Sequence, residues 1–309
     1  MAGGLGELAR YAYEFRPAER PVLTSWIISR IVEAASRLGR GERAYLPVTL
    51  DLGLSVSRVA VSRDSVELPG GEALSVSELR EWLDAVGEGD VLAAVGGELR
   101  KVAIAAGGSY YRLRAVAPDT APTLEINGIH MHRISGVTPW EDTLAKVRCA
   151  RVRRGAKVLD VCTGLGYTAV ASLAAGASHV VTVEVDANVL EIASYNPWSR
   201  KLADERVTVL LGDATELVPM LPDSSFDRVI HDPPAIYAAG ELYSREFYGE
   251  LFRVLRPGGV LFHYTGKTGH TRGVDVARGV ARRLREVGFE AVIVRRVLGV
   301  VARKPRGRP

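Results

Sequence analysis

The sequence lacks several features that would assign it to a specialised class of protein. Its 309 residues include only two cysteines, Cys149 and Cys162, which are too few for a disulfide framework and are not spaced as a metal-binding CxxC pair. We expect both to be buried small apolar residues. No apolar run approaches the roughly 18 residues that span a membrane, and the N-terminus lacks the pattern of a secretion signal. These absences predict a cytoplasmic globular protein.

Amide side chains are also scarce. Glutamine is absent, the asparagines are Asn127, Asn188 and Asn196, and arginine greatly outnumbers lysine. Because thermolabile amides are avoided in proteins that work at high temperature, this bias favours a thermophilic source.

The formal net charge of +4 is unevenly distributed along the chain. From Arg272 to the end, eleven Lys or Arg residues face three acidic ones, so this tail carries +8 and the remainder carries −4. A cationic block predicts a polyanionic partner such as RNA. Ion pairs on a solvated surface would give the same composition, and that alternative stays open.

Residues 1–120 predict a small α+β domain that could hold substrate or RNA. Pro21–Leu38 has apolar residues at helical spacing, and Ser75 with Glu78 has the spacing of a capping box before a second helix. Short β-branched runs such as Leu54–Val61 and Val102–Ala106 lie between Gly-Gly turns.

The segment 121–150 follows a predicted linker at Pro118–Pro122 and contains a predicted hairpin and a connecting helix. Asn127-Gly128 suits a two-residue type I′ turn that would pair Ile126 with Ile129. Period two then places Glu125, His130 and His132 together on one strand face. These three could bind a metal or substrate, although such a set on a strand face is more often simply solvated; we assign no metal ligands.

Residues 151–309 alternate between strands and helices and predict a doubly wound α/β sheet. The last two strands have only a tight turn between them, so we expect an antiparallel hairpin at the sheet edge. Helices are expected near 167–176, 187–195, 241–255 and 274–287. The expected strands are Lys157–Val161, His179–Glu184, Val207–Leu211, Phe226–His231, Gly259–Tyr264, Ala291–Arg296 and Val300–Arg303.

A glycine-rich turn follows the first of these strands, in the string Val158-Leu-Asp-Val-Cys-Thr-Gly-Leu-Gly166. Glycines let the backbone approach a ligand closely, and the next helix offers free N–H groups to an anion. Gly164-x-Gly166-x-x-Ala169 also satisfies the dinucleotide pattern, and Glu184 at the end of the second strand would suit NAD as well.

Residues 150–304 nevertheless resemble a class I, Rossmann-like methyltransferase with an antiparallel last strand. The strings Asp160-Val-Cys-Thr-Gly-Leu-Gly-Tyr-Thr168, Ile230-His-Asp-Pro-Pro234 and Leu261-Phe-His-Tyr-Thr-Gly266 are similar to those of archaeal methyltransferases that depend on S-adenosylmethionine. The resemblance implies this cofactor. It implies cofactor binding by Asp160, Thr163, Gly164, Gly166, Tyr167, Glu184, Asp186, Asp213 and Ala214.

His231-Asp232-Pro233-Pro234 ends the fourth strand and resembles the Asp/Asn-Pro-Pro-aromatic motif of enzymes that methylate conjugated nitrogens. The resemblance implies that Asp232 and a backbone carbonyl accept the N–H bonds of the acceptor amine, while proline fixes φ and donates no competing N–H. These four residues are the predicted catalytic set. Ala235-Ile236 replaces the motif's aromatic residue. Tyr237, Tyr243 and Tyr264 are the predicted substrate-stacking residues.

Three functions therefore compete. An N-methyltransferase acting on an exocyclic amine of structured RNA, with cytosine N4 of ribosomal RNA as the narrower case, accounts for the Asp-Pro-Pro motif and the cationic tail. A polyamine aminopropyltransferase shares the fold, but enzymes of that class have a Gly-Gly-Gly-x-Gly turn where this chain has Cys-Thr-Gly-Leu-Gly. A non-catalytic RNA-binding or assembly factor would bind no cofactor.

Overall fold

The computed structural model describes residues 7–266 and 275–307. The chain forms two compact units. Unit 1 comprises Met1–Phe15, Glu141–Leu190 and Lys201–Pro309, and unit 2 comprises Arg16–Trp140 and Glu191–Arg200. The division therefore lies elsewhere than at the expected linker, Pro118–Pro122, which is inside unit 2. No helix of the described ranges is long and apolar enough to cross a membrane.

Unit 1 is built on a mixed eight-stranded sheet, with its strands in the order β1-β15-β14-β13-β16-β17-β19-β18. Strands β13 to β17 are parallel, whereas β19 is antiparallel to both β17 and β18. The expected C-terminal hairpin is confirmed. The strands are β1 (Ala12–Tyr13), β13 (Lys157–Val161), β14 (His179–Glu184), β15 (Val207–Leu211), β16 (Phe226–His231), β17 (Leu255–Tyr264), β18 (Glu290–Val294) and β19 (Gly299–Arg303).

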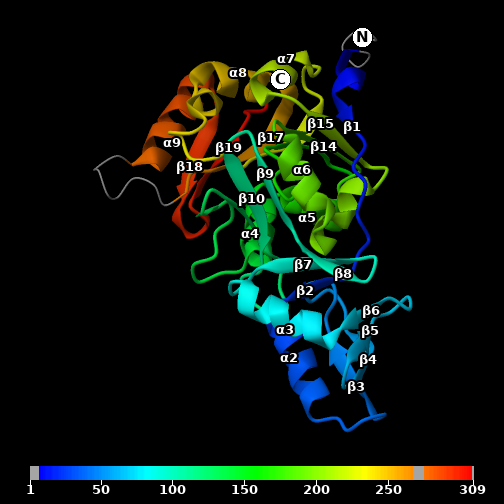
Figure 1. The fold of residues 1–309 in the computed structure, drawn as a ribbon. Helices are drawn as coiled ribbons and strands as arrows, with labels where there is room; N and C mark the ends of the chain where they lie inside the picture. The colour runs from blue at the N-terminus through cyan, green and yellow to red at the C-terminus, as the bar shows by residue number, and fades with distance from the viewer. Residues whose placement is uncertain (1–6, 267–274, 308–309) are drawn as a thin grey trace. The chain divides into compact units, whose positions relative to one another are not determined.

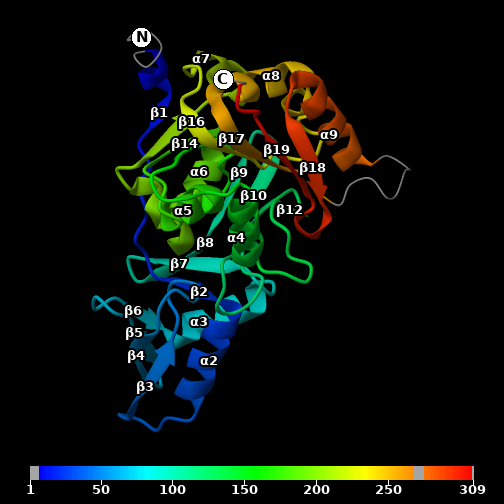
Figure 2. The same cartoon turned by 180° about the vertical axis from the view of Figure 1, so that it is seen from behind.

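Helices cover both sides of this sheet (Figures 1 and 2), as expected for a doubly wound fold. On one side α7 (Ala214–Met220), α8 (Arg245–Val254) and α9 (Val276–Val287) share an apolar core with alternate residues of the strands, including Leu159 and Val161. On the other side α5 (Tyr167–Ala174) packs on β13 and β14. The remaining helices are α4 (Pro139–Cys149), α6 (Ala187–Ser194) and the 3-10 segments η1 (Ala9–Tyr11), η2 (Pro197–Ala203), η3 (Gly240–Tyr243) and η4 (Arg295–Val297).

Unit 2 combines two packed helices with three small antiparallel sheets. Its apolar core joins α2 (Ser25–Ser36) and α3 (Val76–Ala85) to β4, β5 and β7. The strands are β2 (Val22–Thr24), β3 (Arg43–Val48), β4 (Ser57–Ser62), β5 (Ser65–Glu67), β6 (Ala73–Ser75), β7 (Val91–Val95), β8 (Glu98–Lys101), β9 (Ala103–Ala106), β10 (Ser109–Arg114), β11 (Thr123–Ile126) and β12 (Ile129–His130).

Local expectations in unit 2 were partly wrong. The expected helix from Pro21 begins only at Ser25, because Val22–Thr24 pairs with β7. Ser75 forms no capping bond; its hydroxyl lies 2.6 Å from that of Ser77, and Glu78 instead accepts the backbone N–H of Leu99.

The predicted hairpin between β11 and β12 is confirmed in register, with Ile126 opposite Ile129 and Asn127 and Gly128 both at positive φ. Burial does not follow the two expected faces: Leu124 is buried as expected, but Glu125 is buried too and Ile129 is exposed. Glu125 accepts from Arg112 on β10 and lies 3.6 Å from Arg114, so these cations compensate its buried charge. The described residues contain no group of three or more His, Cys, Asp and Glu that could hold a metal ion.

Candidate functional site

The candidate site lies where parallel strands β13, β14, β15 and β16 end. Val161 and His231 are partners across β13 and β16, and the backbone N–H of Asp232 donates to the carbonyl oxygen of Val161 at 3.2 Å. The glycine loop and Asp232 are therefore neighbours at one sheet edge, although they are distant from each other in the chain. Such an edge is where open α/β sheets bind their ligands.

The glycine loop, residues 162–166, has an unusual backbone. Cys162, Gly164 and Gly166 all have positive φ. A Cβ on Gly166 would also lie 2.5 Å from a methyl carbon of Leu202, so a larger residue there would displace Leu202 in addition to straining the backbone. A Cβ on Gly164 would meet nothing within 4 Å, which leaves open space over the loop. Cys162 and Cys149 are only partly buried, contrary to the expectation.

Glu184, the last residue of β14, holds this loop in place. Its carboxylate accepts the backbone N–H of Gly164 at 2.8 Å and the N–H groups of Val185 and Asp186 at 3.0 and 3.1 Å. Burial raises the pKa of Glu184, and these three N–H groups oppose the shift. The carboxylate is thus fixed at the end of the second strand, where the resemblance implies that it binds the cofactor's ribose.

Asp160 lies on β13 and is fully buried. Its Oδ2 accepts the hydroxyl of Thr182 at 2.8 Å, and Thr182 also lies 2.6 Å from the hydroxyl of Thr163. Within the described part of the chain, no hydrogen bond reaches Oδ1. Burial raises the pKa of Asp160 to about 7. A buried carboxyl with an unused oxygen fits a ligand that brings a cationic hydrogen-bond donor.

The other predicted cofactor residues surround the same edge. Asp213 is the N-cap of α7 and accepts the N–H and hydroxyl of Thr215, each at 2.7 Å. Asp186 accepts the backbone N–H of Asn188 at 2.9 Å. Tyr167 and Ala214 are the buried first residues of α5 and α7. The two acids thus cap turns, and their cofactor contacts stay predictions.

Asp232 follows β16 and is paired with a lysine that belongs to none of the sequence motifs. The ammonium of Lys146, on α4, lies 2.6 Å from Oδ2 of Asp232 and 3.1 Å from Oδ2 of Asp142. It also lies 4.0 Å from the centroid of the Tyr264 ring. The side chain of Asp232 is 21% exposed, whereas those of Lys146 and Asp142 are 4% and 3% exposed.

The charge of Lys146 is maintained by its neighbours. Burial by itself would lower the pKa of this lysine, but the carboxylates of Asp232 and Asp142 outweigh burial and raise it above its ordinary value. Lys146 is therefore a buried cation at neutral pH.

Two buried histidines, His231 and His263, lie next to the Asp-Pro-Pro segment. His231 Nε2 donates to the carbonyl oxygen of Leu242 at 2.9 Å, and its ring packs edge-on against that of His263. Burial lowers the pKa of His231 to about 4, so its ring is neutral. Tyr243 donates its hydroxyl to the carbonyl oxygen of Pro234 at 2.8 Å. His231 and Tyr243 thus stabilise the loop, and neither is exposed for stacking on a substrate.

Of the other predicted substrate and catalytic residues, Tyr237 is 75% exposed and Pro233 is buried beside the exposed Pro234. Tyr264 lies at the end of β17, under the ammonium of Lys146. The structure therefore places Asp232, the two prolines and Tyr264 together, while Tyr237 lies on the exposed surface of the loop that follows.

Comparison with known proteins assigns the family. A model described as a methyltransferase domain matches residues 158–259. The uncharacterized protein MJ1233 of Methanocaldococcus jannaschii is 44% identical over 290 residues, which cover 92% of this chain and 96% of that protein. The chain belongs to the family of this archaeal protein. Its second half is a class I methyltransferase fold.

Other named relatives match only part of the chain. Polyamine aminopropyltransferase 2 of Streptomyces coelicolor is 38% identical over 98 residues, covering 29% of this chain and 18% of that protein. Putrescine N-methyltransferase 3 of Nicotiana tabacum is 28% identical over 142 residues, which cover 45% of this chain and 37% of that protein. A spermidine synthase solved with the transition-state analogue AdoDATO superimposes with a TM-score of 0.53 at 19% identity, over 66% of this chain and 73% of that one. This likeness confirms the fold.

Lys146 and Asp142 are neighbours of Asp232 that the sequence did not reveal. They stand four residues apart on a helix that was correctly predicted, and this spacing is typical of an ion pair on one helix face. Nothing in the sequence indicated that the pair would be buried beside Asp232, because the contact with Asp232 spans 86 residues.

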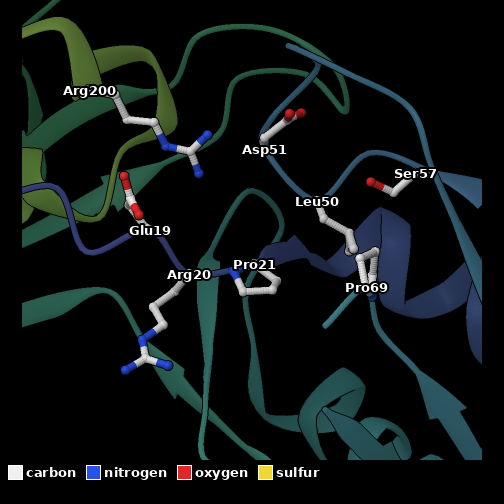
Figure 3. Close-up of a pocket in the computed structure, with 8 residues that line it drawn as sticks. All are labelled: Glu19, Arg20, Pro21, Leu50, Asp51, Ser57, Pro69 and Arg200. Atoms are coloured by element: carbon white, nitrogen blue, oxygen red, sulfur yellow. The ribbon is translucent and has the colours of Figure 1, made fainter. Parts of the chain in front are cut away.

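Unit 2 has a cavity of its own, of about 250 Å³ (Figure 3). Two acidic and two basic side chains line it, together with smaller residues: Glu19, Arg20, Pro21, Leu50, Asp51, Ser57, Pro69 and Arg200. None of the predicted cofactor or catalytic residues is among them, so this cavity is separate from the candidate site.

Proposed function

We propose that this protein is an S-adenosylmethionine-dependent N-methyltransferase whose acceptor is an uncharged amine. The observation that carries the proposal is the position of Asp232, which follows β16 beside the glycine loop and is held there by Val161 and Lys146. In the reaction the lone pair of the acceptor nitrogen would form the new bond to the methyl group that the cofactor supplies, and the electron pair of the broken bond would stay with the departing cofactor. The methylated nitrogen would then release its extra proton to water.

The residues at the edge fit such a cofactor. Oδ1 of Asp160, which accepts no hydrogen bond from the described residues, could accept one from the cofactor's amino group. The pKa of Asp160 is raised, and the cofactor's cation would favour the ionised form of this carboxyl. Glu184 stands where two ribose hydroxyls can donate to it, and the open space over Gly164 lets the ligand reach the loop. When bound, the cofactor supplies a methyl group activated by the positive sulfonium. The chain itself contributes binding and orientation, which supply most of the acceleration.

Asp232 would accept a hydrogen bond from the acceptor amine. Because Oδ2 already accepts from Lys146, the other oxygen is the one that can face the acceptor. A backbone carbonyl of the Pro-Pro segment could take a second N–H, and Tyr243 fixes this segment through Pro234. An amine held by two acceptors presents its lone pair away from both, toward the methyl group.

We further propose an exocyclic amine of a base in structured RNA, with cytosine N4 of ribosomal RNA as the narrower case. The support is the Asp-Pro-Pro motif and the distribution of arginines near the C-terminus. Arg285, Arg295, Arg296 and Arg303 are exposed on or beside α9, η4 and β19. Several cations of the block also have partners within the chain. Lys304 donates to the carbonyl oxygens of Phe252 and Leu255, and Arg285 donates to that of Ala291. Arg278 and Arg282 form exposed ion pairs with Asp275 and Glu286.

A second candidate is transfer to an aliphatic polyamine. The observation that favours it is the partial match to a putrescine N-methyltransferase and to a polyamine aminopropyltransferase. In this case either a methyl or an aminopropyl group would be transferred, depending on whether the cofactor is decarboxylated.

One experiment separates these candidates. The purified protein is given methyl-labelled S-adenosylmethionine together with RNA from cells that lack the gene, or with putrescine and spermidine, and the products are analysed by mass spectrometry. A labelled nucleoside supports the RNA proposal and names the base. Labelled polyamine supports the second candidate, and product formed only with decarboxylated cofactor supports aminopropyl transfer. No product with any acceptor, and no cofactor binding by calorimetry, would leave the non-catalytic function.

A further inference from the structure

The strongest unassigned feature is an alkylammonium ion enclosed at the candidate site, and this ion belongs to the chain itself. Lys146 extends from α4 so that its Nζ contacts Asp232 and Asp142 at 2.6 and 3.1 Å, with the Tyr264 ring 4.0 Å away. Two carboxylates and an aromatic face are a binding site for a cationic amine. The side chain of Lys146 is 4% exposed, so this cation has left bulk water almost completely.

The arrangement determines the charge that an incoming acceptor meets. Without Lys146, the space beside Asp232 and the more deeply buried Asp142 would lack this cation, and a protonated amine would be attracted into it. With Lys146 in place, one cation already compensates Asp232, and a second cation would have to approach a buried ammonium of like charge. Bringing like charges together in a poorly solvated site is unfavourable.

A diamine such as putrescine is the acceptor that this arrangement opposes. At neutral pH both of its amino groups are protonated, so one must lose its proton to react while the other needs an anionic partner. The pair Asp142 and Asp232 is the obvious partner at this site, and the ammonium of Lys146 occupies it. An amine conjugated to a ring is neutral at the same pH and needs no such partner.

We propose that Lys146 is the specificity-determining residue of this site: it takes the place of an acceptor's cation and so restricts the acceptor to an uncharged amine. This inference rests on the proposed function only in taking Asp232 as the residue that faces the acceptor. Lys146 is a positioning residue, because it acts through Asp232 and Asp142 and exchanges no proton in the reaction.

The direct test removes the lysine side chain and returns it as a free ion. Lys146→Ala deletes three carbons and the ammonium, which are the heavy atoms of n-propylammonium. We expect n-propylammonium to raise the unfolding temperature of the full-length Lys146→Ala protein in a saturable manner, because a ligand that binds only the folded state stabilises it. The wild-type protein should not respond, and the Lys146→Ala/Asp142→Ala double variant, which keeps only Asp232 of the two carboxylates, should respond less than Lys146→Ala. The uncharged 1-propanol, which has the same shape, should stabilise none of them.

A second variant keeps the test decisive if Lys146→Ala does not fold. Lys146→Met retains the apolar stem and loses the charge, so both carboxylates stay without their cation. We expect putrescine, measured by calorimetry, to bind this variant at least tenfold more tightly than the wild type. Failure of n-propylammonium to stabilise a folded Lys146→Ala protein, or equal putrescine affinities of Lys146→Met and wild type, would overturn the inference. Both measurements report binding, so they can succeed even if no methylated amine is ever found, in which case the proposed function alone would fail.

Discussion

The backbone N–H of Asp232 donates to the carbonyl oxygen of Val161 at 3.2 Å. Val161 is the last residue before the glycine loop, so this bond joins the loop that would bind the cofactor to the carboxylate that would face the acceptor. Methyl transfer requires the attacking nitrogen, the methyl carbon and the sulfur to be in line and close together. A hydrogen bond between adjacent parallel strands is a rigid way to set that geometry.

Cofactor affinity should depend on pH through Asp160. Burial raises the pKa of this carboxyl to about 7, and the cofactor's ammonium favours its ionised form. Affinity should therefore rise with pH up to about 7, by as much as tenfold per unit, and fall again near pH 8, where an α-amino group such as the cofactor's loses its proton. His231 will not contribute, since burial lowers its pKa to about 4. Calorimetry between about pH 5.5 and 8.5 measures the profile. The Asp160→Asn variant should lack the rise, and an equally steep rise in that variant would assign it to another group.

Glu184→Ala should weaken binding of S-adenosylmethionine by about 1.5–3 kcal/mol, the range for a hydrogen bond to a charged group. The effect has two sources, because Glu184 would bind the ribose and also holds the N–H of Gly164. Glu184→Gln separates them, since its amide oxygen can still accept from Gly164 while the charge is removed. We expect an intermediate affinity for Gln. Wild-type affinity of both variants would show that Glu184 does not bind the cofactor.

Lys146→Ala should destabilise the protein by about 3–5 kcal/mol, because it leaves the carboxylates of Asp142 and Asp232 close together without their cation. The Lys146→Ala/Asp142→Ala double variant should recover part of this stability, since the repulsion between the two neighbouring carboxylates is then gone. Urea unfolding of the three proteins at pH 7 measures the effect. If the double variant is instead less stable than Lys146→Ala, the charges of Asp142 and Lys146 do not influence each other's contribution to the free energy of unfolding.

The exposed arginines should contribute to RNA affinity. Replacing Arg285, Arg295, Arg296 and Arg303 with Ser should weaken RNA binding. The slope of the logarithm of affinity against the logarithm of salt concentration should also become shallower, by roughly 0.7–0.9 for each phosphate that the protein no longer neutralises. The control neutralises Arg153 and Arg154, which are exposed on unit 1 outside the C-terminal block. A salt dependence that is the same in the quadruple variant, the control and the wild type would show that the arginines form only a solvated surface.

Much of the methyltransferase fold could be predicted from the sequence. Strands β13 to β16 begin and end at the predicted residues, because each is a short run rich in apolar and β-branched residues. Helix α7 was missed, since its seven residues are too few for helical periodicity and include Pro219. The start of β17 was placed at Gly259 instead of Leu255 because Arg-Pro-Gly-Gly is typical of a turn.

Contacts that are distant in sequence could not be predicted. Glu125 alternates with apolar neighbours and so was expected on a solvated face, but the cations of β10 compensate its charge and allow its burial. Lys304 belonged to a run of positive charge, yet it donates to the carbonyl oxygens at the end of α8. In both cases the partner lies on another element, and composition or periodicity carries no information about it.

The most direct test of the account is the effect of Asp232 variants on turnover and on cofactor affinity, measured together on the acceptor identified by mass spectrometry. Asp232→Ala should abolish methyl transfer and leave S-adenosylmethionine affinity near that of the wild type, because a group used mainly in the transition state affects the rate more than binding. Asp232→Asn should retain partial activity, since its amide oxygen can still accept the amine hydrogen. Wild-type turnover in both variants would contradict the account, because Asp232 would then only shape the turn after β16.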